Sequence, residues 1–288
     1  MRRLPTVSLR LVLGLIVLMT IAPGSSTVLA AGPSIVALRA AGASQIRDVF
    51  IRPPQRMPDG EPLQMVVAIH GMGGNGVDFG GALASQADRH GWLIVAPTIH
   101  YGDWTDPGQI AREDPALIAW LSDEIAALAE HADYPVRPRV LIFGHSRGAQ
   151  LALRFTEIHP EQVAGVAAVS AGTYTLPVSR DGRNRLLEFP FGLANIARDD
   201  GGKAFDARTF AEVPIWIGVG ADDNNPNDVP DAWDPFIGDD RRERAERFTS
   251  ALSKMGVDVT LNVFDGASHG LSDDMRGAAC AALAQAST

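Results

Sequence analysis

One short segment carries the residue types needed for nucleophilic catalysis. Gly144-His-Ser-Arg-Gly148 is a Gly-x-Ser-x-Gly motif, and it lies between an apolar run at 140–143 and an amphipathic stretch at 147–159. On a strand-to-helix turn of this kind, small flanking residues avoid steric clashes and the serine hydroxyl is lifted out of the sheet. The helix N-terminus next to it favours a developing negative charge. We therefore predict Ser146 as a nucleophile, with an ordinary strand-to-helix turn as the alternative.

A serine hydroxyl needs a base to take its proton, and histidine is the usual base. His269 follows the last predicted strand in a glycine-flanked loop, Phe264-Asp-Gly-Ala-Ser-His-Gly270. From this loop a side chain can reach across the carboxyl edge of the sheet. His145, inside the motif, is expected to point away from the nucleophile. His269 is therefore the predicted base.

The imidazole needs an acid that holds its tautomer and stabilises its protonated form. Ala221-Asp-Asp-Asn-Asn225 leaves the carboxyl end of a predicted strand, so both aspartates are candidates. We favour Asp223 because a Gly-x-x-Asp spacing from Gly220 ends there. Asp222 stays open as the alternative acid.

The oxyanion of an acyl-transfer reaction needs two hydrogen-bond donors. The backbone N–H of Arg147, directly after the nucleophile, is one candidate. The other is the N–H of Met72, in the glycine-rich turn His70-Gly-Met-Gly-Gly74 that follows a predicted buried strand. A phosphate cradle is the competing interpretation of this turn. This interpretation is disfavoured because the turn contains neither a Gly-x-Gly-x-x-Gly motif nor a Gly-Lys-Ser/Thr motif.

The elements that must position these residues alternate along the chain from residue 44 onward. Predicted strands span Gln45–Ile51, Gln64–Ile69, Trp92–Ala96, Val140–Phe143, Val163–Ser170, Ile215–Val219 and Val259–Phe264. Predicted helices span Phe79–His90, Pro115–Ala132, Arg147–His159, Arg241–Lys254 and Asp273–Ala284. Most of the strands are continuous apolar runs, as in parallel strands buried on both faces. The pattern predicts an α/β fold with a mostly parallel, doubly wound sheet flanked by helices.

Composition and the N-terminus set further limits. The chain has 288 residues, and its hydrophobic fraction of 46% excludes a disordered chain. Its single cysteine excludes a disulfide scaffold and a multi-thiolate metal site. Residues 1–30 combine arginines, a short apolar run and an end of small residues that closes with Val28-Leu-Ala30, a pattern typical of a cleaved signal peptide. We expect export to the periplasm or medium, with an uncleaved membrane anchor as the alternative.

The remaining chain, 31–288, is predicted to form a single domain. Its segment 173–213 breaks the strand–helix alternation and carries its own apolar residues, so we expect a small lid-like insertion there. Cleavage after residue 30 would remove three arginines and no acid, which changes the formal net charge from −9 to −12. An acidic chain without a Lys/Arg block is not expected to bind nucleic acid. The loop at 223–234 superficially resembles a calcium loop but lacks the required glycine and glutamate, so no metal site is predicted.

Taken in chain order, His70-Gly71, Gly144-His-Ser-Arg-Gly148, Gly220-Ala-Asp-Asp223 and Ser268-His-Gly270 resemble the α/β-hydrolase superfamily over nearly the whole exported chain. Within it, the sequence looks like secreted esterases of the polyhydroxyalkanoate-depolymerase and feruloyl-esterase kind. The resemblance implies hydrolysis of a small or polymeric carboxylic ester without a cofactor. A serine peptidase of the same fold, and a non-catalytic binding protein on the same scaffold, are the alternatives.

The resemblance leaves the substrate-binding side chains open. Arg147 stands where many relatives have a smaller or apolar residue, and its side chain is expected either at the pocket rim, favouring acidic or polar acyl groups, or in a surface salt bridge. Tyr101 and Trp104 follow a predicted strand and are candidates for the wall of an acyl pocket. Packing within the loop is the alternative role for both.

Overall fold

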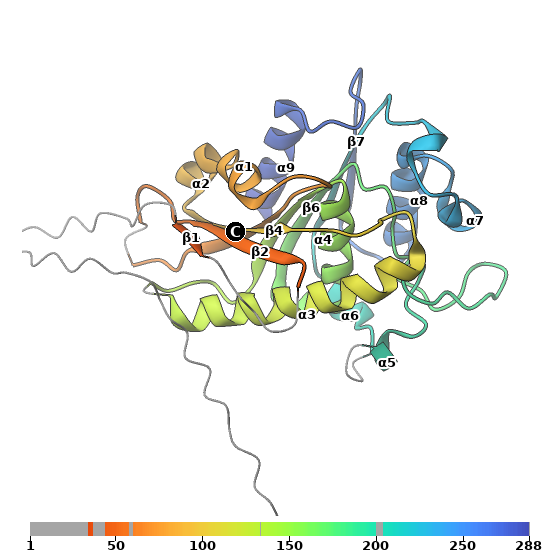
Figure 1. Cartoon of the computed structure of the whole chain (residues 1–288), viewed down its shortest axis with the longest axis horizontal. Coiled ribbons are helices and arrows are strands. Elements are labelled where there is room, and N and C mark those ends of the chain that lie inside the picture. The colour runs from red at the N-terminus through yellow and green to blue at the C-terminus, as the bar shows by residue number, and fades with distance from the viewer. Residues whose placement is uncertain (1–33, 37–43, 58–59, 133, 200–203, 288) are drawn as a thin grey trace, which may run out of the picture.

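The computed structural model describes residues 34–36, 44–57, 60–132, 134–199 and 204–287 (Figure 1). Its described strands form one sheet in the order β1-β2-β4-β3-β5-β6-β7-β8. The strands from β3 onward run parallel, and β1 and β2 are antiparallel to their neighbours. The bounds are β1 Ser34–Val36, β2 Ile46–Arg52, β3 Gln64–Ile69, β4 Trp92–Ile99, β5 Val140–His145, β6 Val163–Val169, β7 Ile215–Gly220 and β8 Val259–Phe264.

The predicted mostly parallel sheet is confirmed, and each of the seven predicted strands is found. Strand β1 was not predicted, because three residues are too few to show a hydrophobic period. The central strands β3, β4, β6 and β7 are buried along their whole length, and β5 is buried except at its last residue, His145, as expected for strands covered on both faces. The edge strand β8 is only partly buried.

Helices cover both faces of the sheet (Figure 1). On one face lie α1 Gly76–Gly81, α2 Ala84–His90 and α9 Asp273–Ala286, which share a hydrophobic cluster with the sheet. On the other face, α3 Pro107–His131, α4 Arg147–Ile158 and α8 Arg241–Lys254 pack in a second, larger cluster. Shorter helical turns are η1 Pro160–Gln162, α5 Ile196–Asp199, α6 Ala207–Ala211, η2 Pro226–Asp228, η3 Asp231–Trp233 and α7 Asp234–Ile237. The doubly wound architecture is therefore confirmed.

Two predicted helices have different bounds from those expected. Pro115, predicted as a helix start, lies inside α3, which begins at Pro107 with the Asp106 carboxylate accepting a hydrogen bond from the first turn. A proline within a helix removes one backbone hydrogen bond, but the buried apolar side chains on both sides of it outweigh that cost. The predicted helix at 79–90 is divided into α1 and α2, since Gly80 and Gly81 favour helix continuation poorly.

The segment 173–213 contributes side chains to the core. Tyr174, Phe189 and Leu193 are each buried and belong to the larger hydrophobic cluster. Its role as a lid stays a prediction. The predicted signal peptide, 1–30, lies outside the described residues, and no helix in the described part of the chain is long and apolar enough to span a membrane.

The parallel order of the strands brings distant loops to one edge of the sheet. The turns after β3, β5, β7 and β8 carry Met72, Ser146, Asp223 and His269, respectively. Strands β3 and β5 are adjacent, and so are β7 and β8, with β6 between the two pairs. Because parallel strands end at the same side, all four turns meet above the carboxyl edge, where α/β sheets bind their ligands.

Candidate active site

Ser146 occupies a sharp turn between β5 and α4. Its backbone has φ 54° and ψ −117°, a conformation that residues other than glycine rarely adopt. Its N–H donates to the carbonyl of Val169 at 2.8 Å. A Cβ at Gly144 would lie 2.5 Å from the carbonyl oxygen of Gly148. A Cβ at Gly148 would lie 2.1 Å from the carbonyl oxygen of Ile69. The two motif glycines are thus required by close backbone approach, as the sequence predicted.

The three predicted side chains form one hydrogen-bonded chain. The hydroxyl of Ser146 lies 3.0 Å from Nε2 of His269, and Nδ1 of His269 lies 3.1 Å from Oδ2 of Asp223. Asp223 is buried, whereas Asp222 is exposed. The structure therefore places Asp223, not Asp222, against the imidazole. In this geometry His269 can remove the proton of Ser146 while Asp223 holds the imidazole orientation.

Arg241, at the start of α8, is a site residue that the sequence analysis missed. Its guanidinium donates to Oδ1 of Asp223 at 3.0 Å and to the carbonyl of Asp228 at 2.6 Å, and the side chain is buried. Burial by itself would raise the pKa of Asp223, but the hydrogen bond from His269 and the charge of Arg241 outweigh it and lower that pKa. Asp223 is thus kept ionised although little water reaches it.

His145 lies closer to the reacting groups than predicted. Its ring centroid is 5.6 Å from that of His269, and its Nε2 lies 3.2 Å from the backbone carbonyl of His269. Burial lowers the pKa of His145 to about 4, so the ring is neutral near neutral pH. Since a carbonyl only accepts, the proton is on Nε2. The expectation that His145 points away was wrong, and its ring supports the loop that carries His269.

The turn after β3 lies directly against the nucleophile. A Cβ at Gly71 would be 3.1 Å from the Cβ of Ser146. Met72 follows it and lines the same cavity as Ser146, and 45% of this residue is exposed. The N–H of Arg147 is the first in α4, and first-turn N–H groups have no acceptor within their own helix. Both predicted oxyanion donors therefore belong to segments that border Ser146.

The side chain of Arg147 is buried, with 1% of its surface exposed, and forms a bidentate ion pair with Asp114 of α3. Asp114 also accepts a hydrogen bond from Arg154 at 2.8 Å. The predictions of a pocket-rim side chain and of a surface salt bridge were therefore both wrong. The physical reason is that α3 passes beside the start of α4 and supplies a buried carboxylate 33 residues away in sequence.

A cavity of about 600 Å³ opens beside Ser146. Its wall includes the turn after β3, the α1 side chains Asp78 and Phe79, and Arg276 of α9. Neither Tyr101 nor Trp104 is among its lining residues, and neither is any residue of 173–213.

Tyr101 and Trp104 have other neighbours. The hydroxyl of Tyr101 donates to the carbonyl of His70 at 3.0 Å. The ring of Trp104 packs over Gly172, and its centroid lies 5.8 Å from the guanidinium of Arg241. The proposed contacts of these two aromatic rings with substrate stay a prediction.

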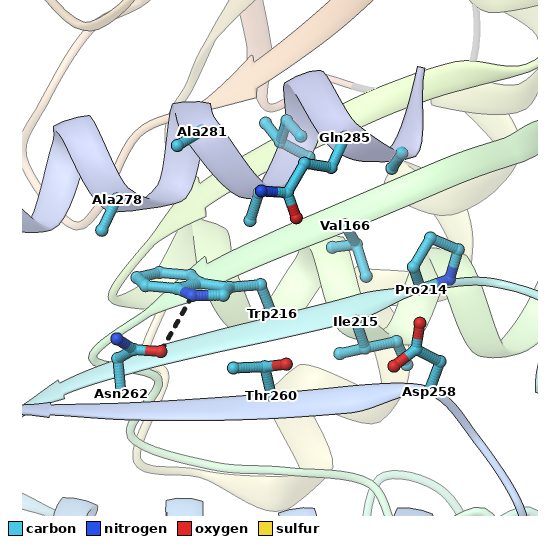
Figure 2. Close-up of a pocket in the computed structure, with 13 residues that line it drawn as sticks. Val166, Pro214, Ile215, Trp216, Asp258, Thr260, Asn262, Ala278, Ala281 and Gln285 are labelled. Atoms are coloured by element: carbon cyan, nitrogen blue, oxygen red, sulfur yellow. Dashed lines mark hydrogen bonds between the residues drawn. The ribbon is translucent and has the colours of Figure 1, made fainter. Parts of the chain in front are cut away.

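A second cavity, of about 460 Å³, lies on the α9 side of β7 and β8 (Figure 2). Figure 2 shows the indole of Trp216 between α9 and β8, with its N–H donating to Asn262 at 3.1 Å. This cavity includes Pro214 and Ile215 at the amino end of β7, whereas Ser146 follows the carboxyl end of β5. In the described part of the chain, no cluster of three or more His, Cys, Asp or Glu side chains is placed to hold a metal ion.

Comparison with known proteins agrees with the fold. A family model described as "alpha/beta hydrolase fold" matches residues 64–262. No curated protein sequence gives a significant match.

Similar solved structures include three named hydrolases. One is LpqC, a poly(3-hydroxybutyrate) depolymerase from Bordetella parapertussis, with 24% identity, TM-score 0.64 and coverage of 88% of this chain and 87% of that one. Poly(aspartic acid) hydrolase-1 from Sphingomonas sp. KT-1 has 20% identity, TM-score 0.60 and coverage of 90% and 98%. An S-formylglutathione hydrolase from Agrobacterium tumefaciens has 18% identity, TM-score 0.57 and coverage of 87% and 95%. At these identities the likeness shows the fold alone.

Proposed function

Because the chain belongs to the α/β-hydrolase family, we propose that it is a serine hydrolase that cleaves carboxylic esters through an acyl-enzyme intermediate. The observation that carries the proposal is the hydrogen-bonded chain from Ser146 through His269 to Asp223 at the mouth of a cavity. A serine next to a base, with the base oriented by an acid, is the arrangement that activates a hydroxyl for acyl transfer.

The reaction proceeds in two halves. In the first, Oγ of Ser146 attacks the ester carbonyl carbon while Nε2 of His269 takes the hydroxyl proton. The tetrahedral intermediate collapses, the bond to the alcohol oxygen breaks, and His269 returns the proton to the leaving alcohol. In the second half, water attacks the acyl-enzyme with His269 again as base, and the acid is released as Ser146 recovers its proton.

The oxyanion that forms in each half is stabilised by backbone donors. The N–H of Arg147, at the N-terminus of α4, and the N–H of Met72 are the proposed pair. Asp223 orients the imidazole and stabilises its protonated form, and Arg241 keeps the Asp223 carboxylate in place.

The size and lining of the cavity agree with an ester substrate that is small or presents one end of a polymer. The apolar part of the cavity wall is formed by Phe79, Phe143 and Leu271, and its polar groups come from Asn75 and Arg276. The similarity to a poly(3-hydroxybutyrate) depolymerase supports a polymeric ester as one member of a substrate panel.

A fluorophosphonate probe tests the proposal. The probe should label the protein at one site, and peptide mass spectrometry should place the adduct on Ser146 because His269 activates that hydroxyl. The labelled protein should lose its turnover of short p-nitrophenyl esters. Absence of labelling together with absence of ester turnover would favour a binding protein, and faster cleavage of a matched amide would favour a peptidase.

Replacing Arg241 with glutamine tests how Asp223 is kept ionised. The variant loses the buried cation, so the pKa of Asp223 rises. As the pH falls, the carboxylate is therefore protonated at a higher pH than in the unmodified protein. The acid limb of the pH–activity profile should move upward by about one pH unit, since an adjacent opposite charge shifts a carboxyl pKa by roughly one to three units.

The control for this prediction is Arg242→Gln. Arg242 is the next residue of α8, but its side chain is 44% exposed and pairs with Glu246 on the helix surface. Its profile should match that of the unmodified enzyme. An Arg241→Gln profile that falls equally at every pH, without a displaced limb, would contradict the proposed role.

A further inference from the structure

Tyr101 connects the two segments that carry the proposed oxyanion donors. Its hydroxyl donates to the backbone carbonyl of His70, which is two residues before Met72. The guanidinium of Arg147 lies 4.9 Å from the centroid of its ring. One side chain therefore contacts both the turn after β3 and the first residue of α4.

The turn after β3 is built around the ring of His70. Nε2 of His70 accepts from the N–H of Ile99 at 2.9 Å, so the proton is on Nδ1, which donates to the carbonyl of Gly71 at 2.6 Å. A Cβ at Gly74 would lie 3.0 Å from this ring. Both ring nitrogens are thus engaged within the fold, and the Tyr101 hydroxyl anchors the first carbonyl of the turn.

The Arg147 side is equally fixed. Asp114 binds both Arg147 and Arg154, and all three side chains are at most 1% exposed. Arg154 in turn donates to Thr173 and Thr175. An ion pair that is this deeply buried cannot exchange its partners for water, so the guanidinium presents a fixed surface to the Tyr101 ring.

Burial also decides the state of the phenol. Burial raises the pKa of Tyr101, which keeps the phenol protonated and therefore a hydrogen-bond donor at any working pH. The ring makes an edge contact with His70, at 5.6 Å between centroids, as well as the cation–π contact with Arg147. The phenol is thus held by three contacts, two with His70 and one with Arg147.

We propose that Tyr101 is a positioning residue that sets the distance between the two oxyanion donors, with the buried Asp114–Arg147 pair as its fixed support. The proposal rests on the proposed ester hydrolysis, because it assigns a role within the same site. Oxyanion stabilisation depends on donors that are already in place when the charge develops. A small shift of this turn relative to α4 would leave the Met72 N–H at the wrong distance, while the apolar wall formed by Phe79, Phe143 and Leu271 stays in place.

The test is Tyr101→Phe, which removes the hydroxyl and keeps the ring against Arg147. We expect kcat for a p-nitrophenyl ester to fall about 10-fold with KM nearly unchanged, less than the roughly 100- to 1,000-fold loss when an oxyanion donor is removed outright. Affinity for a trifluoromethyl ketone, whose adduct carries an oxyanion, should fall by a similar factor.

The control is Tyr134→Phe. Tyr134 packs against the same hydrophobic cluster but precedes the amino end of β5, at the opposite side of the sheet from Ser146. This substitution also removes a phenol hydroxyl, but it should leave kcat and the affinity for the trifluoromethyl ketone unchanged, even if the thermal midpoint falls. A kcat effect in this control as large as that of Tyr101→Phe would overturn the inference.

Two other outcomes would also overturn the inference. Unchanged kcat and ketone affinity in Tyr101→Phe would show that the hydroxyl has only a structural role. A change confined to KM would instead make Tyr101 a substrate contact, as the sequence suggested. Failure of the proposed function is separable from both results, because the unmodified protein would then turn over no ester in the same assay.

Discussion

Replacing Ser146 with alanine should reduce kcat/KM for short-chain p-nitrophenyl esters by about 10⁵-fold or more, the scale of loss expected when the nucleophile of a serine triad is removed. The substitution deletes the atom that His269 contacts at 3.0 Å and leaves no other group at that position to form an acyl-enzyme. Steady-state kinetics with an active-site titration measure the loss. A residual rate could arise only from binding and the oxyanion donors.

The variant should fold normally. Alanine meets the same strain as serine at φ 54°, and within the described part of the chain the hydroxyl makes one hydrogen bond, to His269. Circular dichroism and the thermal midpoint check this point.

Ser170 offers a matched control for that experiment. It follows β6, the strand beside β5, and also has a positive φ of 53°. Its hydroxyl is buried and has no hydrogen-bond partner among the described residues. Ser170→Ala should therefore keep its ester turnover. Retained turnover in Ser146→Ala, with the fold intact, would refute the nucleophile assignment.

Asp223→Asn is the prediction with the second largest effect. We expect kcat to fall by about 10⁴-fold, because an amide that replaces the triad acid favours the wrong imidazole tautomer and stabilises no positive charge. The variant also leaves Arg241 without its buried counter-ion, which lowers stability as well. The rate of the fraction that remains folded, measured by active-site labelling and turnover together, separates the two effects.

Asp222→Asn is the control that the sequence provides. Asp222 is adjacent to Asp223 and exposed, so the substitution should leave kcat and the thermal midpoint nearly unchanged. If Asp222→Asn were the inactive variant and Asp223→Asn the active one, the acid would be assigned wrongly and the loop after β7 would have to rearrange in solution.

Much of the fold and the core of the site could be predicted from local patterns. The buried strands were recognised because each is a continuous apolar run of four to eight residues, a pattern set by burial on both faces. Ser146 and His269 followed from glycine-flanked turns at predicted strand ends, and the preference for Asp223 over Asp222 followed from the Gly-x-x-Asp spacing after Gly220. The split of α1 from α2 and the start of α3 were not predicted, since capping and core packing compete with helix propensity there.

The sequence by itself determined which residues can react and which strands carry them, because chain order and hydrophobic period are local properties. Only the tertiary structure decided what surrounds them. The pairing of Arg147 with Asp114, of Arg241 with Asp223, and of Tyr101 with His70 joins residues 33, 18 and 31 positions apart. These pairings depend on which helix packs beside which loop and on the free-energy cost of burying a charge without a partner. No local sequence pattern contains either of these two factors.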